Sequence, residues 1–129
     1  MDTTSDNSPL DVLIVEDEID ICYLLSGILK KKNLHTAYVT SLTDANLALN
    51  TQNPDILFID NHLPDGLGVD FIHFVKKYHP KTRIVMISAY DTNSDKEKAK
   101  REGVDYFIGK PFTREIINRT VDALLKDFG

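Results

Sequence analysis

The sequence predicts an α/β protein with a five-stranded parallel sheet, doubly wound as (βα)5. Two observations predict this fold class. Five short apolar runs recur along the chain, each rich in β-branched or aromatic residues, and stretches with helical spacing of apolar residues lie between them. Because parallel strands need long crossover connections, this alternation is typical of a parallel sheet with right-handed crossovers and helices on both faces.

The five predicted strands occupy residues 12–15, 36–39, 56–59, 84–87 and 106–108. Each run is short and almost continuously apolar. Strands of parallel sheets read this way because helices cover both of their faces. We therefore expect all five strands to be buried.

The helical stretches differ in the strength of their patterns. The first, over 18–31, places Ile21, Leu24, Leu25, Ile28 and Leu29 on one face. A second helix is predicted to end before residue 54 and a third before residue 80, since both positions are prolines. The segment 92–102 is mostly polar and has a single apolar anchor at residue 99, whereas 116–125 gives a clear last helix.

Size and charge place limits on the function. The 129 residues correspond to one domain over 10–129, preceded by a flexible polar tail over 1–9. A net charge of −5 argues against direct nucleic-acid binding, because an acidic surface repels phosphates. No apolar run approaches the roughly 18–20 residues of a membrane span. Cys22, the lone cysteine, cannot form an intrachain disulfide, which fits a cytoplasmic location.

Chemically active side chains gather where the predicted strands end. In open parallel sheets, ligands bind at the carboxyl ends of the strands. The first strand runs into three acids, the third ends at an acid, the fourth at a hydroxyl group, and the fifth is followed by an ammonium group. These residues are Glu16, Asp17, Glu18, Asp60, Ser88 and Lys110.

This set of groups suits phosphoryl transfer. Carboxylates that are pushed together repel one another unless a cation intervenes, and oxygen ligands of this kind suit Mg²⁺. A carboxylate can also attack phosphorus and form an aspartyl phosphate. The ammonium group of Lys110 and the hydroxyl group of Ser88 could then hold the incoming phosphoryl oxygens.

Four segments, 13–18, 57–66, 85–89 and 103–112, together resemble the receiver domains of response regulators in two-component signalling, of the chemotaxis-receiver type. The resemblance covers residues 10–127. It implies the flavodoxin-like strand order 2-1-3-4-5, and Mg²⁺ or Mn²⁺ as cofactor. It also implies a histidine kinase or a histidine phosphotransfer domain as phosphoryl donor. Such a protein is a phosphorylation switch and not an enzyme that acts on a foreign substrate.

The resemblance implies a role for each residue of the acidic end. Asp60 matches the phosphoacceptor. Asp17 matches the direct metal ligand, Glu16 its water-mediated neighbour, and the backbone carbonyl of His62 the remaining protein ligand. Glu16 departs from the commoner Asp of the family.

Further matches concern the phosphoryl group and the switch. Ser88 matches the switch hydroxyl, Lys110 the phosphoryl-binding lysine, and Ala89 the small residue that leaves room for the phosphoryl group. Phe107, three residues before Lys110, takes the place of the switch aromatic, which is more often Tyr. The bond from Lys110 to Pro111 is expected to be cis.

Two predicted features concern regulation. His62 and Tyr90 flank the phosphoryl pocket at positions that vary in the family, and we expect them to tune the lifetime of the phosphorylated state. The resemblance also implies a partner or dimer surface formed by the fourth helix, the fifth strand and the fifth helix.

Three other functions compete with this interpretation. A phosphohydrolase of the haloacid dehalogenase type also uses an Asp nucleophile, but it normally needs an acid where this chain has His62. A flavodoxin-like electron carrier would need a Ser-, Thr- and Gly-rich loop after the first strand. A pseudo-receiver would normally lack one of the key residues. The receiver itself is either a stand-alone protein or part of a larger regulator.

Overall fold

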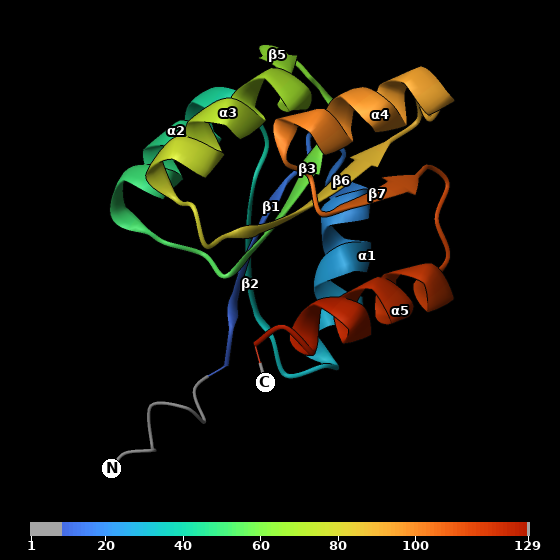
Figure 1. Ribbon diagram of the computed structural model, residues 1–129. Coiled ribbons are helices and arrows are strands. Elements are labelled where there is room, and N and C mark those ends of the chain that lie inside the picture. Colours follow the sequence, from blue (N-terminus) through green and yellow to red (C-terminus); the bar gives the residue numbers. More distant parts are fainter. Residues whose placement is uncertain (1–8, 129) are drawn as a thin grey trace.

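Helices cover both faces of a parallel sheet in the computed structural model, which describes residues 9–128 (Figure 1). The sheet consists of β1 (Asp11–Val15), β2 (His35–Val39), β3 (Ile56–Asp60), β6 (Arg83–Ser88) and β7 (Tyr106–Gly109). The helices are α1 (Ile19–Lys30), α2 (Leu42–Thr51), α3 (Gly68–Tyr78), α4 (Asn93–Glu102) and α5 (Arg114–Leu125). Apart from its last residue, the predicted tail over 1–9 lies outside the described residues.

The sheet has the order β2-β1-β3-β6-β7, and every neighbouring pair of strands is parallel. Counted along the five sheet strands, this is the predicted order 2-1-3-4-5. The chain leaves β1 toward one edge of the sheet and leaves β3 toward the other. The loops after β1 and β3 therefore diverge, which opens a crevice at the carboxyl ends of these two strands.

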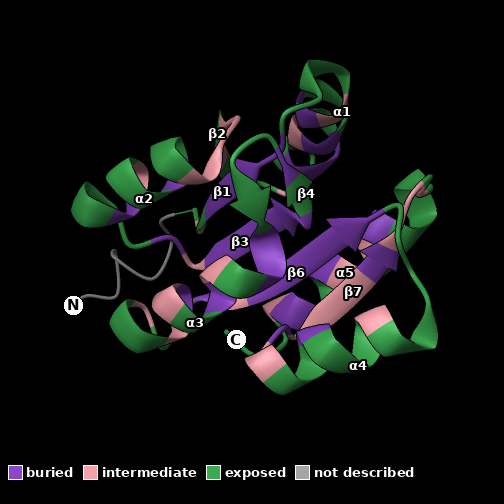
Figure 2. Ribbon diagram, turned by 90° about the horizontal axis from the view of Figure 1, so that it is seen from above, coloured by how far each residue is buried: buried purple, intermediate pink, exposed green. Residues whose placement is uncertain are grey.

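Alternate residues of the central strands pack on opposite faces of the sheet, because side chains of a strand alternate with a period of two. Ile14 and Phe58 belong to the core on the side of α1 and α5. Leu13 and Ile59 belong to the core on the side of α2, α3 and α4. Figure 2 shows the buried residues concentrated in β1, β3 and β6 between the two helical layers. Both cores anchor the strand ends that carry the candidate site.

The prediction that all five strands are buried was wrong for the two edge strands, β2 and β7. The residues of β2 are exposed or half-buried along the whole strand, and in β7 only Ile108 is buried, because each of these strands pairs with one neighbour alone. The apolar and β-branched residues at 36–39 gave the same signal as a central strand. A run of four residues does not reveal whether a second neighbour will cover it.

The helix α1 buries a different set of side chains from the one predicted. Leu25, Ile28 and Leu29 are buried as expected and Cys22 is fully buried beside them, but Leu24, which was predicted on the apolar face, is 45% exposed. Cys22 packs as a small apolar residue, and its thiol donates a hydrogen bond of 3.2 Å to the backbone carbonyl of Glu16. The apolar face of α1 is thus rotated from the predicted one.

Capping explains why the polar segment 92–102 is helical. Thr92 and Asp95 form a capping box at the start of α4, in which each side chain accepts a hydrogen bond from the other residue's backbone amide. The helix ends at Gly103, whose φ of 107° is readily adopted by glycine. Ala99 is its buried anchor, as predicted. Among the described residues, no helix combines the length and the apolar character that a bilayer span requires.

A short antiparallel hairpin of β4 (His62–Leu63) and β5 (Gly66–Leu67) follows β3 and was not predicted. The carboxylate of Asp65 accepts hydrogen bonds from the backbone amides of Leu42 and Thr43, each at 2.9 Å. These amides begin α2 and have no partner within the helix. The hairpin is thus attached to α2 through Asp65.

We predict that Phe58→Ala lowers the free energy of unfolding by about 3–5 kcal/mol, because Phe58 is fully buried in the central strand and its removal leaves a cavity. Urea denaturation measures this value. Leu47→Ala is the control, because Leu47 is 60% exposed and should change stability by no more than about 0.5 kcal/mol. Equal effects of the two substitutions would contradict the core described above.

A pH dependence is expected from Asp65. Hydrogen bonds from the Leu42 amide and from the side chain and amide of Thr43 hold the pKa of Asp65 below its ordinary value. A carboxyl group with a lower pKa in the folded state stabilises the fold above its unfolded pKa, and this contribution disappears as the pH falls through the folded pKa. The urea midpoint of wild type should exceed that of Asp65→Asn above about pH 5, and the gap should shrink as the pH falls below the ordinary Asp pKa of about 4. A gap that widens on acidification would refute this.

Candidate functional site

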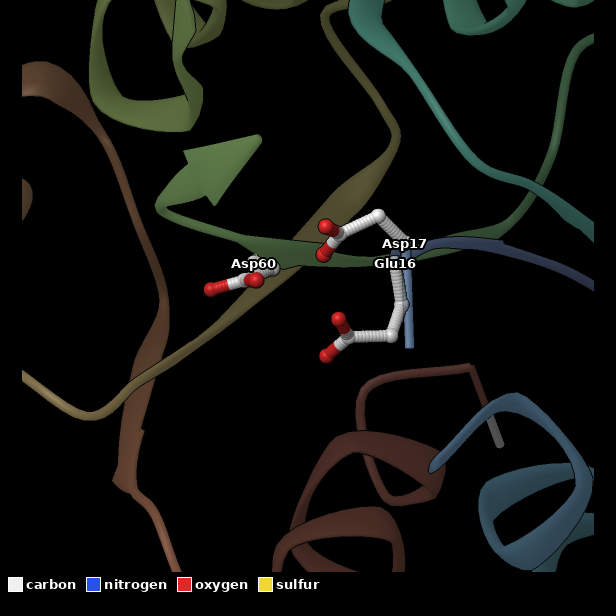
Figure 3. A group of neighbouring side chains, drawn as sticks. All are labelled: Glu16, Asp17 and Asp60. Atoms are coloured by element: carbon white, nitrogen blue, oxygen red, sulfur yellow. The ribbon is translucent and has the colours of Figure 1, made fainter. Parts of the chain in front are cut away.

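Three acids meet at the carboxyl ends of β1 and β3. Glu16 and Asp17 follow β1 directly, and Asp60 is the last residue of β3. One carboxylate oxygen from each residue lies within 4.8 Å of the others. Figure 3 shows Glu16 and Asp17 reaching from the end of β1 toward Asp60. We call these three residues the acidic cluster.

The members of the acidic cluster differ in exposure. Glu16 is 2% exposed and Asp60 is 5% exposed, whereas Asp17 faces solvent. Burial raises the pKa of Glu16 to about 7, and the proximity of Lys110 opposes part of this shift. The backbone amide of His62 donates a hydrogen bond of 3.2 Å to Asp60 Oδ1. The cluster therefore combines two buried carboxylates with one that solvent can reach.

Lys110, which follows β7, reaches into the acidic cluster. Its Nζ lies 2.8 Å from Glu16 Oε1 and 3.4 Å from Asp60 Oδ2. It also lies 3.0 Å from Oε1 of Glu18, an exposed residue before α1. Burial lowers the pKa of Lys110, but its close ionic contact with Glu16, its hydrogen bond to Glu18 and the charge of Asp60 outweigh burial and hold the pKa above its ordinary value. The peptide bond from Lys110 to Pro111 is cis, as expected.

One buried oxygen in the cluster lacks a hydrogen bond. Glu16 Oε1 makes an ionic contact with Lys110, but no donor among the described residues approaches it with the angles of a hydrogen bond. The ammonium group of Lys110 supplies this oxygen with a counter-charge, but a single positive charge is shared among Glu16, Glu18 and Asp60. The donor set is composed of carboxylate oxygens, which Mg²⁺ and Mn²⁺ prefer. The residues present thus fit a hard divalent cation.

A cavity of about 270 Å³ opens onto this site and is lined by Asp17, Asp60, His62, Ala89, Tyr90 and Lys110, together with Glu18. The rings of His62 and Tyr90 lie with their centroids 4.1 Å apart at an angle of 38°, so they form a pair beside the cavity. Six residues that the sequence predicted for the site therefore line one cavity. We call it the acidic cavity.

Two residues that the sequence predicted for the site, Ser88 and Phe107, do not line this cavity. Ser88, the last residue of β6, is fully buried, and its Oγ accepts a hydrogen bond of 3.0 Å from the backbone amide of Tyr90. Phe107 is half-buried on β7 and packs against the core on the side of α3 and α4. Neither side chain lines the acidic cavity in this conformation.

Glu18 is a site residue to which the sequence assigned no role. Its contact with Lys110 joins positions 92 residues apart in the chain. The run of three acids after β1 was a signal that Glu18 lies near the site. Its pairing with the lysine depends on how the loop after β7 closes over the end of β1.

A doubly wound sheet whose carboxyl ends gather an acidic cluster, a lysine and a buried hydroxyl group has the architecture of a phosphorylation switch domain. The family model of the response regulator receiver domain matches residues 12–122. The chain therefore belongs to the response regulator receiver domain family, whose role in two-component signalling is that of a phosphoacceptor. This finding gives no support to a haloacid dehalogenase.

Known proteins of the family resemble this chain over most of its length. It is 28% identical to the probable transcriptional regulatory protein TcrX of Mycobacterium tuberculosis, over 97% of this chain and 53% of that protein. It is 34% identical to the response regulator protein PilR of Pseudomonas aeruginosa, over 77% of this chain and 22% of that protein. The chain thus spans about half or less of the length of these relatives.

A solved structure confirms the fold. The beryllofluoride-activated receiver domain of NtrC4, determined in solution as a dimer, superimposes with a TM-score of 0.86 and 28% identity. The match covers 92% of this chain and 98% of that one.

Proposed function

We propose that Asp60 is the phosphoacceptor and that it takes its phosphoryl group from a phosphohistidine of a histidine kinase or a histidine phosphotransfer domain in the cytoplasm. The observation that carries this proposal is the position of the Asp60 carboxylate, which ends a central strand between the acids of β1 and the ammonium group of Lys110. The chain catalyses its own phosphorylation and dephosphorylation and has no other substrate.

The transfer breaks a phosphorus–nitrogen bond and forms a phosphorus–oxygen bond. A carboxylate oxygen of Asp60 attacks phosphorus, the bond to the histidine nitrogen breaks, and the imidazole keeps the electron pair and takes up a proton. Lys110 is near enough to hold a phosphoryl oxygen by exchanging one of its carboxylate partners. Ala89 leaves room for the phosphoryl group at the mouth of the acidic cavity.

The acidic cluster would hold Mg²⁺ or Mn²⁺, with Asp17 as direct ligand, Glu16 acting through water, and Asp60 and the His62 carbonyl as further ligands. Bound there, the cation neutralises the carboxylates so that an anionic donor can approach. The three carboxylate oxygens that lie within 4.8 Å of one another support this assignment.

Ser88 and Phe107 connect the site with a surface. Ser88 pairs with Gly109 across β6 and β7, and its carbonyl accepts a hydrogen bond of 2.8 Å from the Lys110 amide. After phosphorylation, Ser88 would turn from the Tyr90 amide to a phosphoryl oxygen, and Phe107 would enter the vacated space. The surface of α4, β7 and α5 would then favour a partner or a second copy of this chain. The His62–Tyr90 pair beside the cavity would tune the lifetime of the phosphorylated state.

An apolar cavity of about 400 Å³ next to the acidic cavity suits the donor protein. Ile21, Leu24, Pro111 and Phe112 line it, and it shares Lys110 with the acidic cavity. A helix of the donor that covers these side chains would bring its phosphohistidine within reach of Asp60.

The metal prediction concerns Asp17. Asp17→Asn should weaken Mg²⁺ binding by about tenfold or more, because it removes a charged direct ligand. Titration followed by NMR chemical shifts measures the affinity. Asp20→Asn is a matched control that removes one exposed negative charge outside the cluster. Unchanged affinity in Asp17→Asn would overturn the assigned site.

The labelling prediction concerns Asp60. Acetyl phosphate should phosphorylate wild type in the presence of Mg²⁺, Asp60→Asn should take no label, and Ser88→Ala should be labelled but should switch its surface poorly. Mass spectrometry measures the label, and NMR shifts of α4 and β7 measure the switch. Undiminished label on Asp60→Asn, labelling that ignores Mg²⁺, or a chain that never takes label, as in a pseudo-receiver, would refute the proposal.

The docking prediction separates the two phosphoryl donors. Leu24→Ala should slow transfer from a phosphohistidine protein about fivefold, the effect of losing about 1 kcal/mol of contact energy. Labelling by acetyl phosphate should keep its wild-type rate, because a small donor needs no docking surface. Leu47→Ala removes an exposed leucine from α2 and serves as control. If both donors slow equally, the apolar cavity is not the docking surface.

A further inference from the structure

The hairpin of β4 and β5 carries a proposed metal ligand, yet it has little structure of its own. It contains two residue pairs, His62 with Leu67 and Leu63 with Gly66. An isolated two-stranded hairpin is marginally stable in water even when it is longer than this. The position of the His62 backbone carbonyl must therefore be fixed by what the hairpin contacts.

One end of the hairpin is fixed by Asn61. The backbone carbonyl of Asn61 accepts a hydrogen bond from the Gly68 amide, and its side chain accepts one from the Val69 amide, both at 2.8 Å. These two bonds cap the start of α3, and Asn61 itself is buried. These contacts hold the hairpin where it leaves β3 and enters α3, but they do not reach its tip.

The tip is fixed by Asp65. Its two carboxylate oxygens accept hydrogen bonds from the amides of Leu42 and Thr43 at 2.9 Å, and the Thr43 hydroxyl donates a third at 2.8 Å. Bonds of this kind are charge-assisted, and the start of a helix favours a negative charge. The contact joins positions 22 and 23 residues apart in the chain.

The tip also contacts the same helix through Gly66, which lies against Leu42. Gly66 has a φ of 152°, and a Cβ atom placed on it would lie 3.0 Å from Leu42 Cδ1. Glycine therefore lets the hairpin backbone approach the first residue of α2 closely. Two neighbouring residues of the tip, Asp65 and Gly66, thus dock on one point of the fold.

We propose that Asp65 is a positioning residue, which docks the hairpin on the first turn of α2 and thereby holds the His62 backbone carbonyl in place for the divalent cation. This inference rests on the proposed function, since it takes the cation site from there. Asp65 itself does not belong to the acidic cluster. It acts through the backbone between residues 62 and 65.

Ser41 provides a matched control. It caps the same helix, because its side chain accepts a hydrogen bond of 3.1 Å from the Asp44 amide. It makes this bond from the chain that precedes α2, not from the hairpin. Ser41→Ala therefore weakens the cap of α2 and leaves the hairpin docked, whereas Asp65→Ala weakens the cap and also releases the hairpin.

The experiment measures Mg²⁺ affinity without any phosphoryl donor in wild type, Asp65→Ala, Asp65→Asn, Ser41→Ala and Asp17→Asn, together with hydrogen exchange of the hairpin amides. Asp65→Ala should weaken Mg²⁺ binding about tenfold and speed exchange of the paired Leu63 and Gly66 amides about tenfold. Ser41→Ala should bind within about twofold of wild type. Asp65→Asn keeps one carbonyl acceptor and should fall between wild type and Asp65→Ala.

Three outcomes would overturn the inference. Mg²⁺ affinity of Asp65→Ala within about twofold of wild type would show that the hairpin needs no docking. Equal weakening in Ser41→Ala and Asp65→Ala would assign the effect to the stability of α2. If wild type and Asp17→Asn bind Mg²⁺ equally, the proposed cation site itself fails, and this inference fails with it. The Asp17 variant thus separates the two failures.

Discussion

The pairing of Lys110 with several carboxylates is the interaction on which the site depends. Its ammonium group contacts Glu16, Glu18 and Asp60, so it joins the loop after β7 to the ends of β1 and β3. Two of these acids are buried, and a buried carboxylate without a counter-charge would be costly. The carboxylates still outnumber the positive charge that contacts them. Lys110 therefore links the three chain segments of the site, and the excess of negative charge that remains favours a further cation.

The rest of the fold makes this arrangement possible. Alternate residues of β1 and β3 fill two separate cores, so both strands are fixed on two faces and their carboxyl ends cannot shift independently. The polar residues of the site come directly after these strands, where the packed cores hold the backbone in place. Two helix starts use side chains from the loop after β3, since Asn61 caps α3 and Asp65 caps α2. The loop that carries His62 is therefore held by hydrogen bonds to the starts of both α2 and α3.

The prediction of the fold from the sequence was largely correct, and its errors have identifiable causes. The five sheet strands, the five helices and the strand order followed from alternating patterns and from the resemblance. The exposure of β2 could not be predicted, because an edge strand and a central strand of four residues look alike. The exposure of Leu24 was not predicted either, since a small rotation of the apolar face changes which side chain meets the sheet.

For the candidate site, the sequence by itself determined which groups stand at the strand ends, because strand periodicity and the parallel topology place Asp17, Asp60 and Lys110 on the same rim. The tertiary structure decided which of these groups touch, which are buried, and which residues support them. Glu18 meets Lys110 across 92 positions, and Asp65 meets α2 across more than 20. Contacts of this range depend on loop closure and helix placement, which no local pattern of residues encodes.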